Sequence, residues 1–388
     1  MLFSILGIEA LLLPYFLSKD VYGEVEFYKF SAFLAQFLLF GSGTGYVVRY
    51  LKSPFQNRDI ITFNFYFFAY FHALFAGIVI AWFSSWAIAI LSFFTMLAMI
   101  FESTIKVKEK YLLAMSFKPL LSFMLICFLP LLLLFQWQLT NYLVSAYSLA
   151  IILYVVLGRR AQRIEKRKGG KLSITSFFVA VNNYTKNIKS GFVMNASTAM
   201  MFGFFYIDRA IVRDKFPELL GDYSLSYSIM QLTIVAITTF SYVNLIEFGK
   251  EKTESSLFKK KLVVSFKKCS ILFLIIGSCS IVFSYGAEQF YNYEQVFETT
   301  ILMVVLFGIS NVFSSLNSAH LYLGSVHIMT AMMLFTITAS LTLNWYLPFK
   351  SINDYYILLG KTYGLYLLFS LFSGTYIFYK LHNIEKKT

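Results

Sequence analysis

Long apolar runs follow one another along almost the whole chain, with short polar connections between them. Runs such as residues 120–135 and 271–283 do not alternate apolar and polar positions, as the strands of a membrane barrel do. Inside a bilayer the backbone must satisfy its own hydrogen bonds, so unbroken apolar runs form helices. The pattern predicts an all-α polytopic membrane protein with about twelve transmembrane helices. The predicted spans are residues 2–18, 27–48, 60–82, 86–104, 113–135, 139–157, 188–207, 223–246, 265–286, 297–320, 326–347 and 355–379.

The composition supports the same conclusion. Of the 388 residues, 58% are hydrophobic and 14% are charged, whereas a soluble domain carries roughly 25% charged residues. So few charges could not cover a water-facing surface, which excludes a soluble protein. The first apolar stretch has no basic lead and no small-residue cleavage site, so we expect it to remain as a span rather than to be removed as a signal peptide.

Basic residues gather in alternate connections. With the N-terminus in the cytoplasm, 26 of the 33 Lys and Arg residues fall in cytoplasmic segments. The positive-inside rule therefore predicts that both termini are cytoplasmic. The net charge of +13 then reflects loops that face an anionic leaflet, so we expect no nucleic-acid partner.

The two halves of the chain resemble each other. Tyr22-Gly23-Glu24 opens the second predicted span, and the similar sequence Leu-Gly-Asp-Tyr at 220–223 opens the eighth, about half a chain length later. Six spans in each half would make parallel repeats, with a binding site between the halves at mid-depth. We therefore predict an N-terminal six-helix lobe at 1–157, a cytoplasmic basic linker at 158–187 and a C-terminal six-helix lobe at 188–388.

Ionisable residues inside membrane spans are candidates for function, because burying them there is costly. Glu9 is the deepest acid of the first span and could hold a proton, a cation or a sugar hydroxyl, or be satisfied by a neighbouring helix. Pro14 is expected to bend that helix as a hinge. Arg49 could bind a diphosphate through its planar guanidinium, or snorkel to the interface. Glu247 occupies the corresponding position of the second repeat, which suggests an Arg49–Glu247 inner gate.

Further candidates lie in the other spans. Asp208 and Arg209 end the seventh span on the outer side, where they could form a gate, contact a headgroup or simply mark the interface. Lys361 either snorkels or faces the cleft. His72 and His320 are lone histidines in apolar surroundings, either packed and hydrogen-bonded or acting as proton relays. Asparagines could bind sugars or join helices; they are Asn64, Asn195, Asn244, Asn311 and Asn317.

Other chemical motifs are missing from the sequence. Gly360-Lys361-Thr362 lacks the earlier glycine of a phosphate loop and lies in a predicted membrane helix. Cys127, Cys269 and Cys279 have no metal-site spacing, and we expect them to act as small apolar residues. We therefore predict neither an ATPase nor a metal site, and no catalytic residues.

Several short motifs together resemble Wzx-type O-antigen flippases, the polysaccharide transporter branch of the multidrug/oligosaccharidyl-lipid/polysaccharide (MOP) exporter superfamily. They cover about a quarter of the chain and mark the superfamily better than the sugar. One departure is the short N-terminus, which lacks the polar lead-in usual before the first span. The motifs are Gly7-Ile8-Glu9, LPYFLS at 13–18, VYG at 21–23, GSGTG at 41–45 before Arg49-Tyr50, YIDR at 206–209 and LGDY at 220–223.

This resemblance implies a MATE/MOP-like fold with two lobes in a V shape around a central cavity. It implies a flippase of the bacterial inner membrane that moves an undecaprenyl-diphosphate-linked oligosaccharide to the outer leaflet by alternating access. The polysaccharide polymerase and the chain-length regulator of the same pathway are the expected partners. No cofactor is expected, and coupling to H⁺ or Na⁺ is left open.

Three other functions are alternatives to the flippase. A multidrug or other cation antiporter of the same superfamily usually keeps a cluster of buried acids, and here only Glu9 stands out. A flippase for peptidoglycan precursors normally has two more spans. A membrane polymerase or ligase carries a large outer loop with arginines and histidines, whereas the longest predicted outer loop here, at 208–222, has about fifteen residues.

Overall fold

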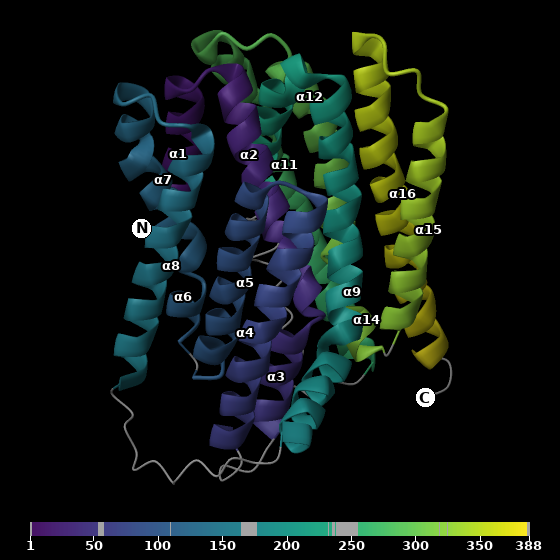
Figure 1. The fold of residues 1–388 in the computed structure, drawn as a ribbon. Coiled ribbons are helices and arrows are strands. Elements are labelled where there is room, and N and C mark those ends of the chain that lie inside the picture. The colour runs from purple at the N-terminus through teal and green to yellow at the C-terminus, as the bar shows by residue number, and fades with distance from the viewer. Residues whose placement is uncertain are drawn as a thin grey trace. The chain divides into compact units, whose positions relative to one another are not determined.

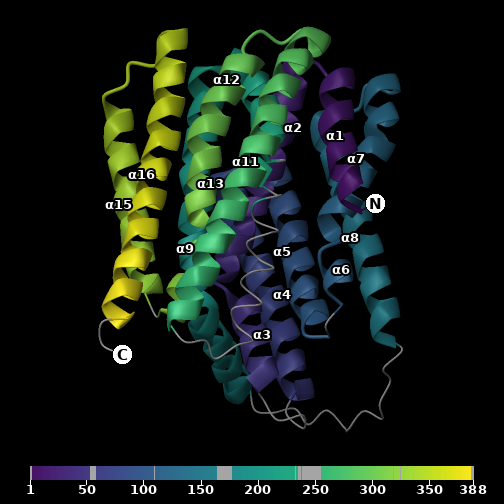
Figure 2. The same cartoon turned by 180° about the vertical axis from the view of Figure 1, so that it is seen from behind.

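The computed structural model describes residues 2–52, 58–108, 110–163, 177–231, 233–234, 237, 255–317, 319–323 and 325–385. All regular secondary structure among these residues is helical (Figures 1 and 2). The predicted all-α class is therefore confirmed for the described chain.

The first half contains α1 (Leu2–Phe16), α2 (Lys19–Leu34), η1 (Ala35–Leu39), α3 (Ser42–Lys52), α4 (Arg58–Phe83), α5 (Trp86–Lys106), α6 (Tyr111–Ala114), α7 (Phe117–Leu134) and α8 (Leu139–Arg163). The second half contains α9 (Phe177–Lys215), η3 (Pro217–Leu219), α11 (Ser255–Tyr291), α12 (Val296–Met303), η4 (Val304–Gly308), α13 (Ile309–Ser314), α14 (Ala319–Tyr322), α15 (Val326–Trp345) and α16 (Ile352–Glu385). Residues 220–231 form a further helical segment.

Eight described helices are long and apolar enough to cross a membrane, and a bent pair of helices makes a ninth. The short apolar helix at Ile5–Phe16 matches the first predicted span. The seventh predicted span lies within the long helix α9, which carries polar and charged side chains along its length. The predicted span 223–246 falls largely outside the described residues. The polytopic membrane architecture is thus confirmed, and the count of twelve stays a prediction.

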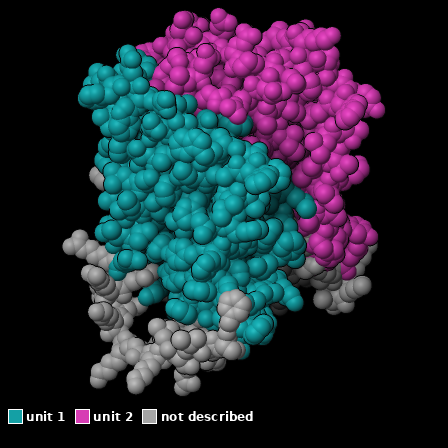
Figure 3. Space-filling view, in the orientation of Figure 1, with its two compact units in different colours: residues 1–16, 25–202 teal, residues 17–24, 203–388 magenta. Residues whose placement is uncertain are grey.

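The chain forms two compact units (Figure 3). Unit 1 contains residues 1–16 and 25–202, and unit 2 contains residues 17–24 and 203–388. Helix α9 contributes to both units, and both ends of the predicted linker are helical, because α8 continues to Arg163 and α9 begins at Phe177. The predicted pair of six-helix lobes remains a prediction.

In unit 1, helix α4 has one face that packs against neighbouring helices and an opposite face that carries exposed aromatic side chains. Its small residues Ala69, Ala73 and Ala76 are buried against α5 and η1, where they allow close helix approach. Its opposite face carries a row of exposed rings at four-residue spacing, Phe63, Phe67, Phe71 and Phe75. Exposed aromatic rows of this kind suit a hydrocarbon environment and not water.

The second span of unit 1 is bent. Phe40 and Gly41 both have positive φ, at 49° and 74°, and they separate η1 from α3. The helical axis turns there by 52°. Glycine tolerates the left-handed backbone that this turn requires.

In unit 2, one face of α16 forms the centre of the packing. Tyr355, Leu359, Tyr363 and Tyr366 recur every three or four residues and are all buried. The ring of Phe205 from α9 lies 5.0 Å from that of Tyr366. Helices α15 and α16 run side by side as a hairpin in both ribbon views (Figures 1 and 2), and they are in contact.

Candidate functional site: buried charges in each unit

Unit 1 contains an ion cluster that joins three helices. The ammonium of Lys29 on α2 lies 2.6 Å from Oε1 of Glu9 on α1 and 2.5 Å from Oε1 of Glu26. The hydroxyl of Ser122 on α7 donates a hydrogen bond to the other oxygen of Glu9. Glu9 is only 5% exposed, so its charge is neutralised by specific partners and not by water.

Arg49 ties α3 to α9. Its Nη1 donates to the backbone oxygen of Asn183 and, at 2.7 Å, to Oδ1 of Asn187, while Nη2 lies 3.3 Å from Oδ1 of Asn183. The structure therefore places Arg49 against amide groups of α9 that fall within the range predicted as linker. The predicted Arg49–Glu247 gate cannot be traced, because Glu247 lies outside the described residues.

Glycines bring α3 and α9 into backbone contact beside Arg49. A Cβ at Gly45 would lie 1.7 Å from the backbone oxygen of Asn187, and one at Gly191 would lie 2.0 Å from that of Gly41. No side chain fits at these positions without a shift of backbone. The Gly41-x-x-x-Gly45 pattern thus marks a close helix contact whose partner is α9.

His72 and Pro14 are two further candidates in unit 1 that the structure describes. Nδ1 of His72 is 2.8 Å from the hydroxyl of Tyr184, and its ring lies 5.6 Å from that of Phe40. This is the hydrogen-bonded packing position considered from the sequence. Pro14 lies inside α1, in its last turn before Phe16, and its role as a hinge stays a prediction.

Unit 2 holds a second group of buried charges. Asp208 and Arg209 on α9 are 1% and 2% exposed. The hydroxyl of Thr362 donates to Oδ1 of Asp208 at 2.9 Å, while Oδ2 has no hydrogen-bond partner among the described residues. The guanidinium of Arg209 lies over two tyrosine rings, 4.6 Å from Tyr227 and 5.4 Å from Tyr223. Such cation–π contacts stabilise a charge that water does not reach.

Lys361 lies next to Thr362 on α16 and points to α15. Its ammonium donates a hydrogen bond to the side-chain oxygen of Asn344. It also acts electrostatically on Asp208. The structure therefore brings together three residues that the sequence named separately, namely Asp208, Arg209 and Lys361, within one unit.

Residues 17–24, which include the first turns of α2, pack inside unit 2. Lys19 forms an ion pair with the buried carboxylate of Asp222, and Nε and Nη2 of Arg213 bind the two oxygens of Glu24 at 2.7 and 2.9 Å. The hydroxyl of Tyr22 lies 3.1 Å from that of Ser228. Burial raises the pKa of the Asp222 carboxyl, and the Lys19 ammonium opposes this effect.

The two repeat motifs meet in this segment. A Cβ at Gly23 would lie 3.0 Å from the backbone nitrogen of Gly221, and a Cβ at Gly221 would lie 2.5 Å from the backbone oxygen of Lys19. Both glycines are required by close backbone approach. The sequence similarity of the two motifs thus corresponds to a direct contact between them.

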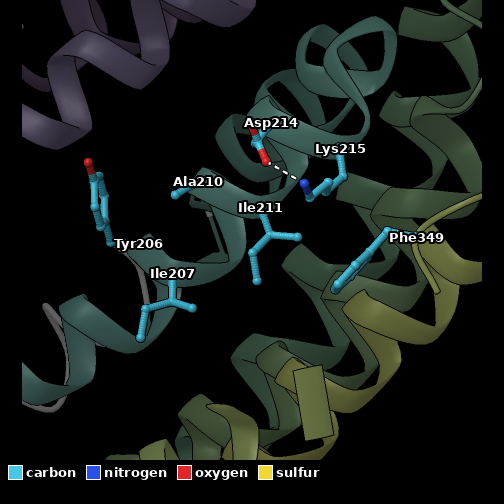
Figure 4. Close-up of a pocket in the computed structure, with 7 residues that line it drawn as sticks. All are labelled: Tyr206, Ile207, Ala210, Ile211, Asp214, Lys215 and Phe349. Atoms are coloured by element: carbon cyan, nitrogen blue, oxygen red, sulfur yellow. Dashed lines mark ion pairs between the residues drawn. The ribbon is translucent and has the colours of Figure 1, made fainter. Parts of the chain in front are cut away.

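The C-terminal part of α9 also borders an apolar pocket of about 310 Å³ (Figure 4). Ile207 and Ile211 line one side, Phe349 lies across from Ile211, and Asp214 and Lys215 form an ion pair of 2.8 Å at the end. Asp208 and Arg209 do not line this pocket. It is therefore separate from the buried charges of unit 2.

The fold has counterparts among solved structures. The chain matches the inward-facing conformation of a multidrug resistance MATE family transporter of the MOP superfamily with a TM-score of 0.74 and 10% identity, covering 100% of this chain and 96% of that chain. The fold is that of a MATE transporter. A match to the outward-facing conformation of a MATE family transporter has a TM-score of 0.58 and 11% identity, over 99% and 92% of the two chains. No protein-family model and no curated protein matches the sequence.

Within this MATE fold, the sequence missed several partners of the charged residues. Lys29 and Glu26 were not singled out, although their spacing of three residues on one helix signals an ion pair. The hydrogen bond of Thr362 to Asp208 could not be predicted, because a threonine in an apolar run is common. Asn195 and Asn311 bond to the backbone oxygens of Phe37 and Phe307, so these two asparagines join or brace helices.

Proposed function

We propose that the protein is a flippase that moves an undecaprenyl-diphosphate-linked oligosaccharide from the inner to the outer leaflet by alternating access. The observation that carries the proposal is the MATE fold over the whole chain, with solved neighbours in both inward- and outward-facing conformations. A fold that adopts both conformations suits the transport of a polar group across a bilayer. A charged headgroup cannot cross hydrocarbon unaided, because burying an unpaired charge costs many kcal/mol.

The cations in the helices favour an anionic substrate. Arg209 and Lys361 in unit 2 belong to helices of the membrane-spanning fold. Arg209 lies over tyrosine rings and Lys361 donates to a neutral amide, and both side chains carry N–H groups of the kind that bind phosphate oxygens. Guanidinium and ammonium groups are the donors that bind phosphate oxygens in proteins.

The rival function is multidrug export, which the solved neighbours are named for. It would need buried acids that bind a cationic drug. Glu9 is already neutralised by Lys29, and Asp208 lies near the cation Lys361, which would repel a cationic drug. This arrangement favours the flippase over a drug carrier.

We propose the same membrane placement and partners as the sequence predicts. The protein would lie in the bacterial inner membrane with both termini cytoplasmic and would deliver its substrate to the polymerase and chain-length regulator outside. Asp208 is our candidate for coupling to H⁺ or Na⁺, because its Oδ2 is buried and has no hydrogen-bond partner in the described part of the chain.

The experiment is deletion of the gene in its host, followed by measurement of two pools. One pool is surface polysaccharide, and the other is undecaprenyl-diphosphate-linked repeat units held inside the cell. Loss of the surface polymer with complete single units trapped on the inner leaflet supports the proposal. Single units that still reach the outer leaflet, with only long polymer missing, would place the defect in polymerisation or ligation and contradict it.

A further inference from the structure

Lys118 has an unusual position in unit 1. It is the second residue of α7, a helix apolar enough to span the membrane, and its side chain is exposed. Its ammonium lies 4.4 Å from the centre of the Phe33 ring on α2. A lysine in a membrane helix normally finds a carboxylate or reaches the interface, because an unpaired charge in hydrocarbon is costly.

The acids near Lys118 are bound to other lysines. The charges that act on it are those of Glu102 and Lys29. Glu102 forms an ion pair of 2.5 Å with Lys106, four residues later on α5. Lys29 is held between Glu9 and Glu26. Within the described chain, no carboxylate lies within ion-pair distance of Lys118, so its ammonium is left to bind another anion.

Aromatic rings extend from Lys118 toward α9. The ring of Phe33 lies 5.0 Å from that of Phe202, and Phe37 stacks on Phe202 at 5.6 Å. All three rings are partly exposed. Flat, partly exposed rings bind the apolar face of a sugar, and an adjacent ammonium binds a phosphate on it.

We propose that Lys118, Phe33, Phe37 and Phe202 bind a phosphorylated saccharide, with the phosphate at Lys118 and the sugar face on the rings. This inference rests on the proposed flippase function and deepens it by naming the site in unit 1 that first contacts the headgroup. The same chemistry could be offered by a lipid-linked or a free sugar phosphate. The experiment separates these two sources.

The test measures binding to the purified full-length protein in nanodiscs by calorimetry. The probes are farnesyl diphosphate, farnesol and glucose 1-phosphate, which carry the tail with the anion, the tail alone, and the sugar phosphate alone. K118Q should raise the Kd for farnesyl diphosphate at least about tenfold, the loss expected for one charge-assisted hydrogen bond. K118R should bind close to wild type, because it keeps the charge. Farnesol binding should not change in either variant.

The rings are tested separately. Phe202→Leu should weaken binding of glucose 1-phosphate several-fold and leave farnesyl diphosphate nearly unchanged, because only the sugar contacts the ring. Preference of the wild type for farnesyl diphosphate would assign the site to a lipid-linked anion, and preference for glucose 1-phosphate to a free sugar phosphate. The matched control is K186Q, since Lys186 is an exposed lysine on α9 of the same unit.

Equal affinity of K118Q and wild type for farnesyl diphosphate, or no binding of any probe by wild type, would overturn the assignment and leave Lys118 as an interface anchor. An unchanged thermal unfolding midpoint in each variant shows that folding is intact. The flippase proposal fails independently, if deletion of the gene leaves translocation of lipid-linked units unchanged. If deletion of the gene abolishes translocation but K118Q binds the probes like wild type, the flippase proposal stands and only the assignment of this site is wrong.

Discussion

The guanidinium of Arg213 binds both carboxylate oxygens of Glu24, with Nε–Oε1 at 2.7 Å and Nη2–Oε2 at 2.9 Å. This two-point contact fixes the N-terminal part of α2 to α9 within unit 2. Lys19 and Asp222 add a second ion pair to the same segment. Two ion pairs and two close glycine contacts thus hold residues 17–24 within unit 2.

Reversal of the Arg213–Glu24 pair tests its role in transport. Each single variant, E24R or R213E, should lower translocation, because two like charges then face each other. The double variant E24R/R213E should recover part of the activity. Both side chains are about one-third exposed, so the loss of stability should be about 1 kcal/mol or less. Translocation in proteoliposomes is the measurement, and a double variant no better than the singles would contradict the pairing.

The contact between α3 and α9 makes a prediction about stability. Gly191→Ala should destabilise the protein by about 1–3 kcal/mol, because a Cβ there meets the backbone of Gly41. Gly203→Ala on the same helix is the matched control, since a Cβ at that position has nothing within 4 Å. The measurement is the thermal unfolding midpoint of each variant in detergent, which should be lower for Gly191→Ala than for Gly203→Ala. Equal midpoints would show that the helices do not meet at Gly191.

The stability of the protein should depend on Lys29, the cation of the ion cluster in unit 1. Lys29→Met leaves Glu9 and Glu26 without the ammonium between them, and breaking a buried ion pair in this way costs about 3–5 kcal/mol. Glu26→Gln should cost less, because Lys29 keeps Glu9. The comparison is made from the fraction of folded protein after heating. A larger loss in Glu26→Gln than in Lys29→Met would refute the assigned order.

Asp208 should be required for transport more than for folding. Asp208→Asn keeps an oxygen to accept the hydrogen bond of Thr362 and removes only the charge. We expect translocation to fall at least about tenfold with the folded fraction little changed. Asp214→Asn, six residues later on α9 with its side chain 70% exposed, should have no effect. Transport by Asp208→Asn at the wild-type rate would remove Asp208 from the mechanism.

The helical architecture was predictable because long apolar runs in a membrane leave few alternatives to a helix. The contact at Gly41 and Gly45 was predictable for a similar reason, since small residues four apart on a membrane helix permit close packing. The positions of Asp208, Arg209 and Lys361 were also identified as candidates. Charges inside apolar runs stand out without knowledge of the fold.

The partners of these charges could not be predicted. The sequence gives the position of a residue on its own helix and says nothing about which helix faces it. Lys118, for example, lies near the start of α7, and nothing in the sequence shows that its ammonium lies over Phe33 on α2. The sequence motif at Gly23 suggested an internal repeat, but the contact between Gly23 and Gly221 required the fold.

The most direct test of the flippase is translocation by the purified protein. Liposomes carrying undecaprenyl-diphosphate-linked oligosaccharide are prepared with wild-type protein, with Asp208→Asn and without protein, and a membrane-impermeant reagent modifies sugars on the outer face. We predict that wild type exposes the inner-leaflet sugars to the reagent over time, while the other two preparations expose only those already outside. If wild-type protein leaves the inner pool protected and instead moves a cationic dye across the same membrane, the flippase account is wrong and drug export replaces it.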